Sequence, residues 1–235
     1  ASGNTAIGKS ALGANTTGAQ NTAVGQGALL ASTTGNYNVA IGQAASGSNT
    51  TGVSNVSVGQ AAMYYNTTGG QNTASGRNAL FANTTASYSS AFGFAALLGN
   101  TTGVANTAVG DSAGYTTTTG YKNNFLGASS RGQSATAFAQ NVIGYNVQSV
   151  SSNYTTIGIN GSISWLNVGG TSWSGSSDSR LKDNITSSTA GLSFINDLRP
   201  VTYEWKAKGD VPVELDNYEE GSTERVNGTD KVQHG

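Results

Sequence analysis

A glycine recurs every 17 residues along most of this chain of 235 residues. The nine in-phase glycines are Gly8, Gly25, Gly42, Gly59, Gly76, Gly93, Gly110, Gly127 and Gly144. A second glycine (first at Gly18) and an asparagine (first at Asn4) recur at the same interval, and the unit reads N-T-A-(I/V)-G-x-x-A-L-x-x-N-T-T-G-x-x. Chance does not hold so many glycines in phase, so the sequence predicts an array of repeats that pack against one another.

The residue types of the repeat favour short strands joined by turns. Gly, Asn and Thr at this density disfavour α-helix. We expect Thr5–Ile7 to be a strand that ends at Gly8, while residues 15–18, Asn-Thr-Thr-Gly, are typical of a turn. Strand, turn, strand and turn then make one coil of an elongated parallel β-solenoid or β-roll, with coils about 4.8 Å apart. The predicted fold class is mostly β.

Stacked coils would place equivalent residues in columns. The Ile column is Ile7, Val24, Ile41, Val58, Ser75, Phe92, Val109, Leu126 and Ile143; the Ala column is Ala11, Ala28, Ala45, Ala62, Ala79, Ala96 and Ala113; the Leu column is Leu12, Leu29, Met63, Leu80 and Leu97. One such coil buries little by itself. We expect the Leu column to face outward and to be buried in a homotrimer, which also protects strand edges. The Asn column is expected to form an amide ladder inside the coils.

The Asn-Thr-Thr turns allow two other interpretations. Sequons that fit N-glycosylation begin at Asn15, Asn49, Asn66, Asn83 and Asn100. Turn chemistry also explains them, and we favour it because they occupy the turn of the repeat. An ice-binding face of threonines is the second alternative, but adjacent threonines point to opposite sides of an extended chain.

The composition changes near residue 177. Only five of the 23 charged residues lie before that point, and both prolines lie beyond it. Such a shift marks a domain boundary. We therefore predict a repeat shaft at 1–144, a β neck at 145–176 and a C-terminal α+β segment at 177–235.

The neck is predicted to contain a β-hairpin. Residues 153–159 alternate and are followed by Asn160 and Gly161, a hairpin-turn pair. Trp165 and Trp173 belong to the same region. We favour a packing role for both tryptophans, with a carbohydrate platform as the alternative.

Composition excludes several functions. The chain has no Cys and one His, His234, which excludes a Cys/His metal cluster and disfavours a Ser-His-Asp triad. A net charge of -1 disfavours a nucleic-acid partner, and no apolar run approaches the about 20 residues of a membrane helix. Asp111 is the only acidic residue in 1–176, so one copy cannot form the carboxylate pair of a glycoside hydrolase. We expect no cofactor, no metal and no membrane insertion.

A long ordered motif opens the charged segment. It comprises residues 177–185, S-D-S-R-L-K-D-N-I, and residues 191–205, G-L-S-F-I-N-D-L-R-P-V-T-Y-E-W. Leu192, Ile195 and Leu198 have helical spacing, and Pro200 ends the predicted helix. Alternation in residues 201–205 predicts a strand.

The motif, together with Gln233-His234-Gly235, resembles the C-terminal intramolecular chaperone of phage tail spikes and fibres, a self-cleaving serine peptidase domain of endosialidase type. The resemblance implies a domain that assists trimer assembly and then cuts itself off before the first Ser of the motif. On this chain it makes Ser177 the nucleophile, Lys182 the general base and Ser176–Ser177 the scissile bond. In the family the domain continues past the His-Gly step, so residues 177–235 correspond to its N-terminal part.

This chemistry is consistent with the residues present. A Ser hydroxyl reacts when a base removes its proton. Lys182 could act as that base if burial or a neighbouring cation lowered its pKa. Arg180 could supply the cation, or could instead pair with Asp178 or Asp183. Without the resemblance, Lys182 would be interpreted as a solvated residue at a helix start. The predicted activity is one self-cleavage per chain, with no turnover of a substrate.

The repeats at 4–144 resemble both the β-roll heads of trimeric bacterial adhesins and the shafts of phage tail fibres. Together with the chaperone motif, this resemblance implies the distal shaft of a trimeric tail fibre, which is assembled in the host cytoplasm and then becomes part of the virion. Its implied partners are other tail proteins and a bacterial surface receptor, for which we expect a glycan. A cellular adhesin head, which should carry a membrane anchor after the rod, and an ice-binding solenoid are the alternatives.

Overall fold

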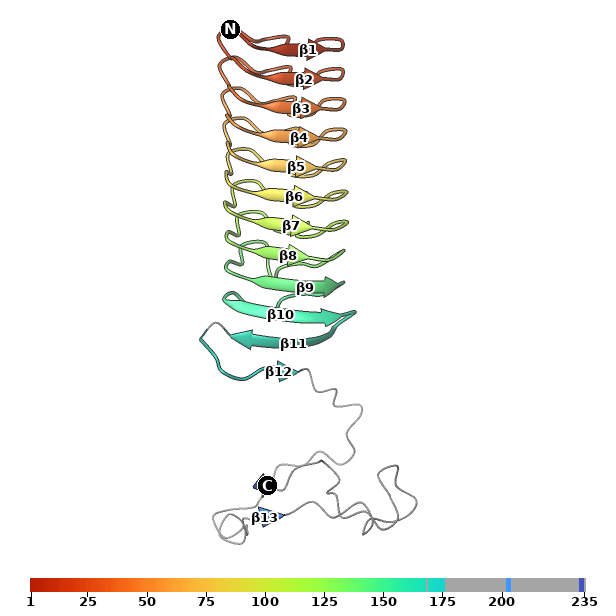
Figure 1. The fold of residues 1–235 in the computed structure, drawn as a ribbon, viewed down its shortest axis with the longest axis vertical. Coiled ribbons are helices and arrows are strands. Elements are labelled where there is room, and N and C mark those ends of the chain that lie inside the picture. Colours follow the sequence, from red (N-terminus) through yellow and green to blue (C-terminus); the bar gives the residue numbers. More distant parts are fainter. Residues whose placement is uncertain (168, 176–201, 204–232, 235) are drawn as a thin grey trace, which may run out of the picture. The chain divides into compact units, whose positions relative to one another are not determined.

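The computed structural model describes residues 1–167, 169–175, 202–203 and 233–234 (Figure 1). The chain divides into two compact units, Ala1–Ser177 and Asp178–Gly235. The first unit contains a 12-stranded sheet, and the second contains a pair of short strands.

The first unit is a β-solenoid whose strands recur every 17 residues. Its first nine strands are β1 (Thr5–Ile7), β2 (Thr22–Val24), β3 (Val39–Ile41), β4 (Val56–Val58), β5 (Thr73–Ser75), β6 (Ser90–Phe92), β7 (Thr107–Val109), β8 (Asn124–Leu126) and β9 (Asn141–Tyr145). Each pairs in parallel with the next, and residues one coil apart are partners (Figure 1). No helix occurs in the described residues. The predicted parallel β-solenoid is therefore confirmed.

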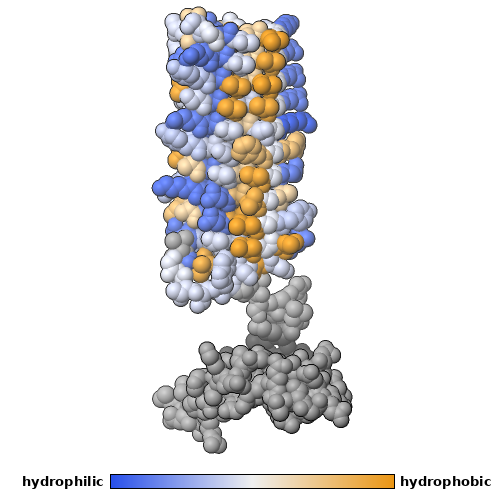
Figure 2. Space-filling view, in the orientation of Figure 1, coloured by the Kyte–Doolittle hydropathy of each residue, from blue (hydrophilic) through white to orange (hydrophobic). Residues whose placement is uncertain are grey.

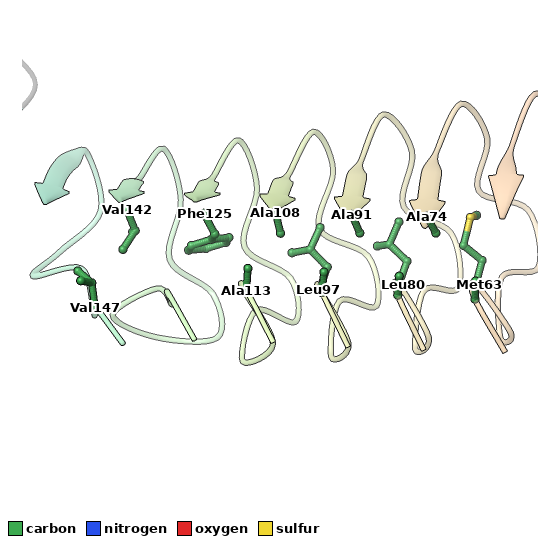
Figure 3. Close-up of a cluster of buried hydrophobic side chains, with 13 residues drawn as sticks. Met63, Ala74, Leu80, Ala91, Leu97, Ala108, Ala113, Phe125, Val142 and Val147 are labelled. Carbon is green, nitrogen blue, oxygen red and sulfur yellow. The ribbon is translucent and has the colours of Figure 1, made fainter. Parts of the chain in front are cut away.

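The interior of the solenoid is narrow and lined mainly by small side chains. In β2 to β8 the middle residue faces inward, and Ala23, Ala40, Ala74, Ala91 and Ala108 are fully buried. The Leu column enters from the opposite wall, as Figure 3 shows for Met63, Leu80 and Leu97. These three residues and Leu29 are also fully buried. Small residues on the strands thus accommodate large residues on the facing wall, as close packing requires.

The prediction that the Leu column faces outward is wrong. Ala28 and Leu29 are neighbours in the chain, and both are 0% exposed. An extended chain would place them on opposite sides. Leu29 instead has a φ of 50°, in the left-handed region, and Met63, Leu80 and Leu97 share this conformation. The turn in the backbone lets both neighbouring side chains enter the interior.

The Asn column forms the expected amide ladder inside the coils. The backbone N–H of Asn38 donates to Oδ1 of Asn21 over 2.9 Å, and that of Asn55 donates to Oδ1 of Asn38 over 3.0 Å. Nδ2 of Asn38 donates to the Gly52 carbonyl over 2.8 Å. These amides are buried, so each one satisfies backbone groups that would otherwise lack partners and ties one coil to the next.

The in-phase glycines are a steric requirement of stacking. Gly59 has a φ of +131°, which L side chains rarely adopt. A Cβ there would lie 2.6 Å from the carbonyl oxygen of Gly76 in the next coil. The other in-phase glycines have the same conformation and the same close approach, so their recurrence follows from the spacing of the coils.

A β-hairpin follows the parallel coils. Strand β10 (Tyr154–Ile159) pairs in parallel with β9 and antiparallel with β11 (Ser162–Asn167), which in turn pairs with β12 (Ser174–Gly175). The turn residues Asn160 and Gly161 have φ values of 49° and 86°, as a type I′ turn requires. The hairpin predicted from the Asn-Gly pair is confirmed.

In the second unit the described residues form two strands. Strand β13 (Thr202–Tyr203) pairs antiparallel with β14 (Gln233–His234). Strand β13 lies within residues 201–205, where the alternating pattern predicts a strand. The predicted helix that ends at Pro200 lies outside the described residues.

Candidate functional site

The predicted catalytic residues lie outside the part of the chain that the structure describes. The nucleophile Ser177, the base Lys182, the supporting residues Asp178 and Arg180, and Ser176 of the scissile bond all fall in residues 176–201. Their roles therefore stay predictions.

Backbone pairing in the second unit connects two separate parts of the motif. Thr202 pairs with His234, and Tyr203 pairs with Gln233. Thr202 and Tyr203 belong to the L-R-P-V-T-Y-E-W segment, whereas Gln233 and His234 belong to the second segment on which the resemblance depends. The two segments thus meet in one antiparallel pair, although many residues separate them in the sequence.

An apolar stripe follows the outer face of the strands of the first unit. We call it the strand-face stripe; it consists of Ile7, Val24, Ile41, Val58, Ser75, Phe92, Val109, Leu126, Ile143 and Ile157, of which Ser75 alone is polar. Ile157 of β10 extends the column because it pairs with Ile143. Phe92 is 42% exposed and Leu126 is 52% exposed, and Figure 2 shows the stripe as a long hydrophobic band. A contiguous apolar surface of this kind is typical of a protein interface.

The strand face also lacks charge. Strands β1 to β11 contain no Asp, Glu, Lys or Arg. The shaft's Lys9, Arg77 and Asp111 lie in the turns that follow strands, and the Arg77 guanidinium lies 5.7 Å from the centroid of the Phe94 ring. Charges that normally protect an exposed strand surface from association are therefore absent from this face.

Three aromatic rings gather on the wall opposite the strands. We call Tyr64, Tyr65 and Phe81 the aromatic platform. The ring centroids of Tyr64 and Tyr65 are 4.8 Å apart, those of Tyr65 and Phe81 are 5.0 Å apart, and those of Tyr64 and Phe81 are 5.8 Å apart. Tyr65 is 48% exposed, while Tyr64 and Phe81 are half-buried. This cluster was not predicted from the sequence, although its residues occupy variable positions of the repeat and Tyr65 departs from the small residues found at its position in other coils.

The asparagines of the sequons face the interior. Asn49, Asn66, Asn83 and Asn100 are all fully buried. Nδ2 of Asn66 donates to Oδ1 of Asn49 over 2.8 Å and to the Gly69 carbonyl over 2.9 Å. The folded coils thus use these amides as a second ladder, which favours turn chemistry over glycosylation.

The threonines of the same turns form two columns. In the first, the Thr50 hydroxyl donates to the Thr67 carbonyl over 2.9 Å, and equivalent bonds join the other coils. In the second, threonines such as Thr34 and Thr102 are exposed. Only one of the two columns is therefore exposed, whereas an ice-binding array needs a flat face of repeated threonines.

The described residues show no group of three or more His, Cys, Asp or Glu side chains that could hold a metal ion. Within the same part of the chain, no helix is long and apolar enough to cross a membrane. Of the two neck tryptophans, Trp173 is 52% exposed and Trp165 is half-buried.

Comparison with known proteins identifies one family. Residues 177–224 match the family described as the chaperone of endosialidase. No curated protein and no solved structure matches the chain. The family match begins at Ser177, the residue at which the sequence motif begins.

The solenoid and the chaperone segment together fit a phage tail fibre with an endosialidase-type chaperone domain. The chain is thus tail-fibre-like: a β-solenoid precedes an intramolecular chaperone segment in the sequence. A chaperone domain of this type implies a component of the virion tail.

Proposed function

We propose that this chain is the distal shaft of a phage tail fibre, which attaches the virion to the surface of a bacterial host. Its C-terminal segment is an intramolecular chaperone that promotes trimerisation and then cuts the chain once before Ser177. The observation that carries the proposal is the order of the two parts: a β-solenoid of stacked repeats is followed by a chaperone-of-endosialidase match that starts at Ser177. This order favours a tail fibre over a cellular adhesin head, for which we expect a membrane anchor after the rod.

Trimerisation needs a surface that the copies share, and the strand-face stripe supplies one. The Leu column cannot serve, because its side chains fill the interior of the coils. The stripe repeats once per coil, so a parallel copy of the same chain presents an identical repeat and can match it coil by coil. The stripe lies beside a second column, which is polar at positions such as Thr22, Thr73 and Thr107 and apolar at Val39 and Val56. The apolar surface is therefore one side chain wide along most of the strands and two wide at β3 and β4. A narrow apolar ridge of this kind suits three copies that converge on one axis.

Self-cleavage requires no group beyond the chain itself and one water molecule. In the proposed step, the Ser177 hydroxyl attacks the carbonyl carbon of Ser176, Lys182 accepts the hydroxyl proton, and the peptide nitrogen of Ser177 leaves as a protonated amine. The resulting ester between Ser176 and the Ser177 side chain is then hydrolysed by water. The products are a shaft that ends at Ser176 and a released segment that begins at Ser177.

The experiment that tests this function is intact-mass analysis under denaturing conditions. The full natural polypeptide that contains this chain would be compared with its Ser177→Ala and Lys182→Ala variants. We expect the natural protein to yield a new N-terminus at Ser177 and both variants to stay whole. Asp183→Asn is a useful control, because we assign this neighbouring carboxylate no catalytic role. An uncleaved natural protein would remove the peptidase assignment.

A further inference from the structure

We propose that the aromatic platform, Tyr64, Tyr65 and Phe81, is a carbohydrate-binding site that holds a neutral pyranose ring of the host surface glycan. This inference rests on the proposed attachment function and names a site for it. Tyr64 and Phe81 are stacked with an interplanar angle of 15°, while Tyr65 stands nearly edge-on to both rings. The cluster therefore offers a rigid, partly exposed aromatic surface with the mobility of its side chains already reduced.

The fold does not need these aromatic residues. The first of the two positions is Gly or Leu in four other coils and aromatic at Phe81 and Tyr115, whereas the second is aromatic only at Tyr65 among the coils of the repeat and is elsewhere Ala, Ser, Gly or Thr. Those coils have the same strands and the same turns. Gly47 also leaves room for the platform, because a Cβ there would lie 3.1 Å from Cε2 of Tyr64. The aromatic pair is thus a local addition to a repeat that folds without it.

The chemistry of the surface favours a neutral sugar. The coil that carries Tyr64 and Tyr65, residues 55–71, contains no Asp, Glu, Lys or Arg. The coil of Phe81 contains one charged residue, Arg77, whose guanidinium lies 5.7 Å from the ring centroid of Phe94 in the following coil. A pyranose ring has an apolar face of C–H groups, which packs on aromatic rings, and hydroxyls at its rim, which need hydrogen-bonding partners. The Tyr65 phenol can donate and accept, and exposed Thr68 belongs to the same coil. An anionic or cationic ligand would find no counter-charge in this coil.

The platform also stays accessible in the proposed assembly. Tyr64 directly follows Met63, which lies on the wall opposite the strands (Figure 3). The strand-face stripe belongs to the other wall, so copies that pack through the stripe leave the platform free. A receptor-binding surface must face away from the assembly axis, and this wall does so.

Substitutions that copy the equivalent residues of other coils test the site without disturbing the repeat. Tyr64→Leu and Phe81→Leu introduce the residue found at Leu30 and Leu98, and Tyr65→Ala introduces the residue found at Ala14, Ala31 and Ala82. Tyr88→Ala is the matched control, because Tyr88 is 64% exposed, lies in a different turn and has Ala105 as its equivalent. Binding would be measured for the full chain on an array of immobilised O-antigen, core and capsular oligosaccharides.

We expect the natural chain and Tyr88→Ala to bind a common neutral oligosaccharide equally well, and each platform variant to bind it about tenfold more weakly. Tyr65→Phe should reduce the affinity for the oligosaccharide less than Tyr65→Ala does, because it keeps the aromatic ring. If the platform variants bind as well as the natural chain, the glycan binds at another site, and the proposed attachment function is unaffected. If the natural chain binds no neutral glycan but still cleaves at Ser177, the platform fails and the chaperone part of the proposed function stands.

Discussion

Two departures from the repeat offset each other at the scale of single residues. Ala86 stands where other coils have a glycine, and Ser89, three residues later, stands where they have an asparagine of the ladder. At an equivalent site, a Cβ on Gly35 would lie 2.5 Å from the Gly52 carbonyl oxygen of the next coil and 3.1 Å from Nδ2 of Asn38. The methyl group of Ala86 thus takes space that an asparagine amide would use, and the shorter Ser89 fits beside it.

The pair can be tested by restoring the repeat. We predict that Ser89→Asn alone lowers the free energy of unfolding, whereas Ser89→Asn combined with Ala86→Gly raises it by about 1 kcal/mol. In the double variant the amide can accept from the N–H of Asn106, whose present bond to the Ser89 hydroxyl is long at 3.3 Å. Chemical denaturation of the four proteins of this double-mutant cycle measures the coupling. Strictly additive effects would contradict the steric explanation.

Single residues also explain why the Asn column was predicted correctly and the direction of the Leu column was not. The ladder follows from the in-phase recurrence of Asn, because an amide can bond to its own copy one coil away. The inward direction of Leu29 depends instead on a left-handed backbone, which Leu disfavours and for which the sequence carries no local signal. Burial and the hydrogen bond from the Leu29 N–H to the Ala45 carbonyl, 3.0 Å long, hold this conformation. Both contacts depend on the neighbouring coil.

In one coil, a larger residue on the strand is matched by a smaller residue on the facing wall of the interior. In β8 the middle residue is Phe125, where most strands have Ala, and on the facing wall Gly114 replaces a residue of the Leu column. A Cβ on Gly114 would lie 2.6 Å from Cδ2 of Phe125. The phenyl ring therefore fills the space that Leu80 or Leu97 fills in other coils (Figure 3).

This matching of side-chain volumes predicts that a second substitution can restore the stability lost in the first. Phe125→Ala alone should lower the free energy of unfolding by about 3–5 kcal/mol, because it leaves a cavity. Gly114→Leu alone should also destabilise, because the new side chain collides with the ring. The two changes together recreate the usual pairing of Ala and Leu, and Gly114 already has the left-handed φ of 66° that the Leu column adopts. We expect thermal and denaturant unfolding to show that the double variant recovers most of the lost stability. A double variant no more stable than Phe125→Ala would contradict the proposed matching of volumes.

At the scale of secondary-structure elements, the sequence predicts the strands that recur with the repeat and the hairpin that depends on a local turn motif. The strands follow from the 17-residue period, and the hairpin follows from Asn160 and Gly161. The aromatic platform was not predicted, because Tyr64 and Phe81 become neighbours only when the register of adjacent coils is known. The catalytic pair, Ser177 and Lys182, rests on a resemblance to a family, and no distance between the two side chains tests it.

At the scale of the whole molecule, the shaft has two long walls with different properties. The strand wall carries the apolar stripe and has no charged residue in its strands, while the opposite wall carries variable residues, including the platform. The strand wall suits contact between identical copies, because in parallel register each coil meets the same coil of its partner. A variable wall suits recognition, because changes there leave the repeat intact. The proposed homotrimer and the proposed attachment function therefore use different walls and do not compete.

Assembly through the strand-face stripe should be sensitive to charge. Ile41→Asp with Val109→Asp places two carboxylates in the strand-face stripe of every copy. In a trimer these charges would meet near the axis, where they lose hydration without gaining a partner, so we expect the variant to be monomeric. Thr34→Asp with Thr102→Asp is the control, because it adds the same charge at two exposed turn positions away from the stripe.

Light scattering coupled to size-exclusion chromatography gives the mass of each form, and circular dichroism checks that the coils persist. We expect a mass three times that of the chain for the natural protein and the threonine control, and the mass of one chain for the stripe variant. The coils should survive in the monomer, because their interior is filled by residues of the same chain, such as Leu80 and Ala91. A stripe variant that remains trimeric would show that the copies meet elsewhere, and a monomeric natural protein would remove the trimer from the proposed function.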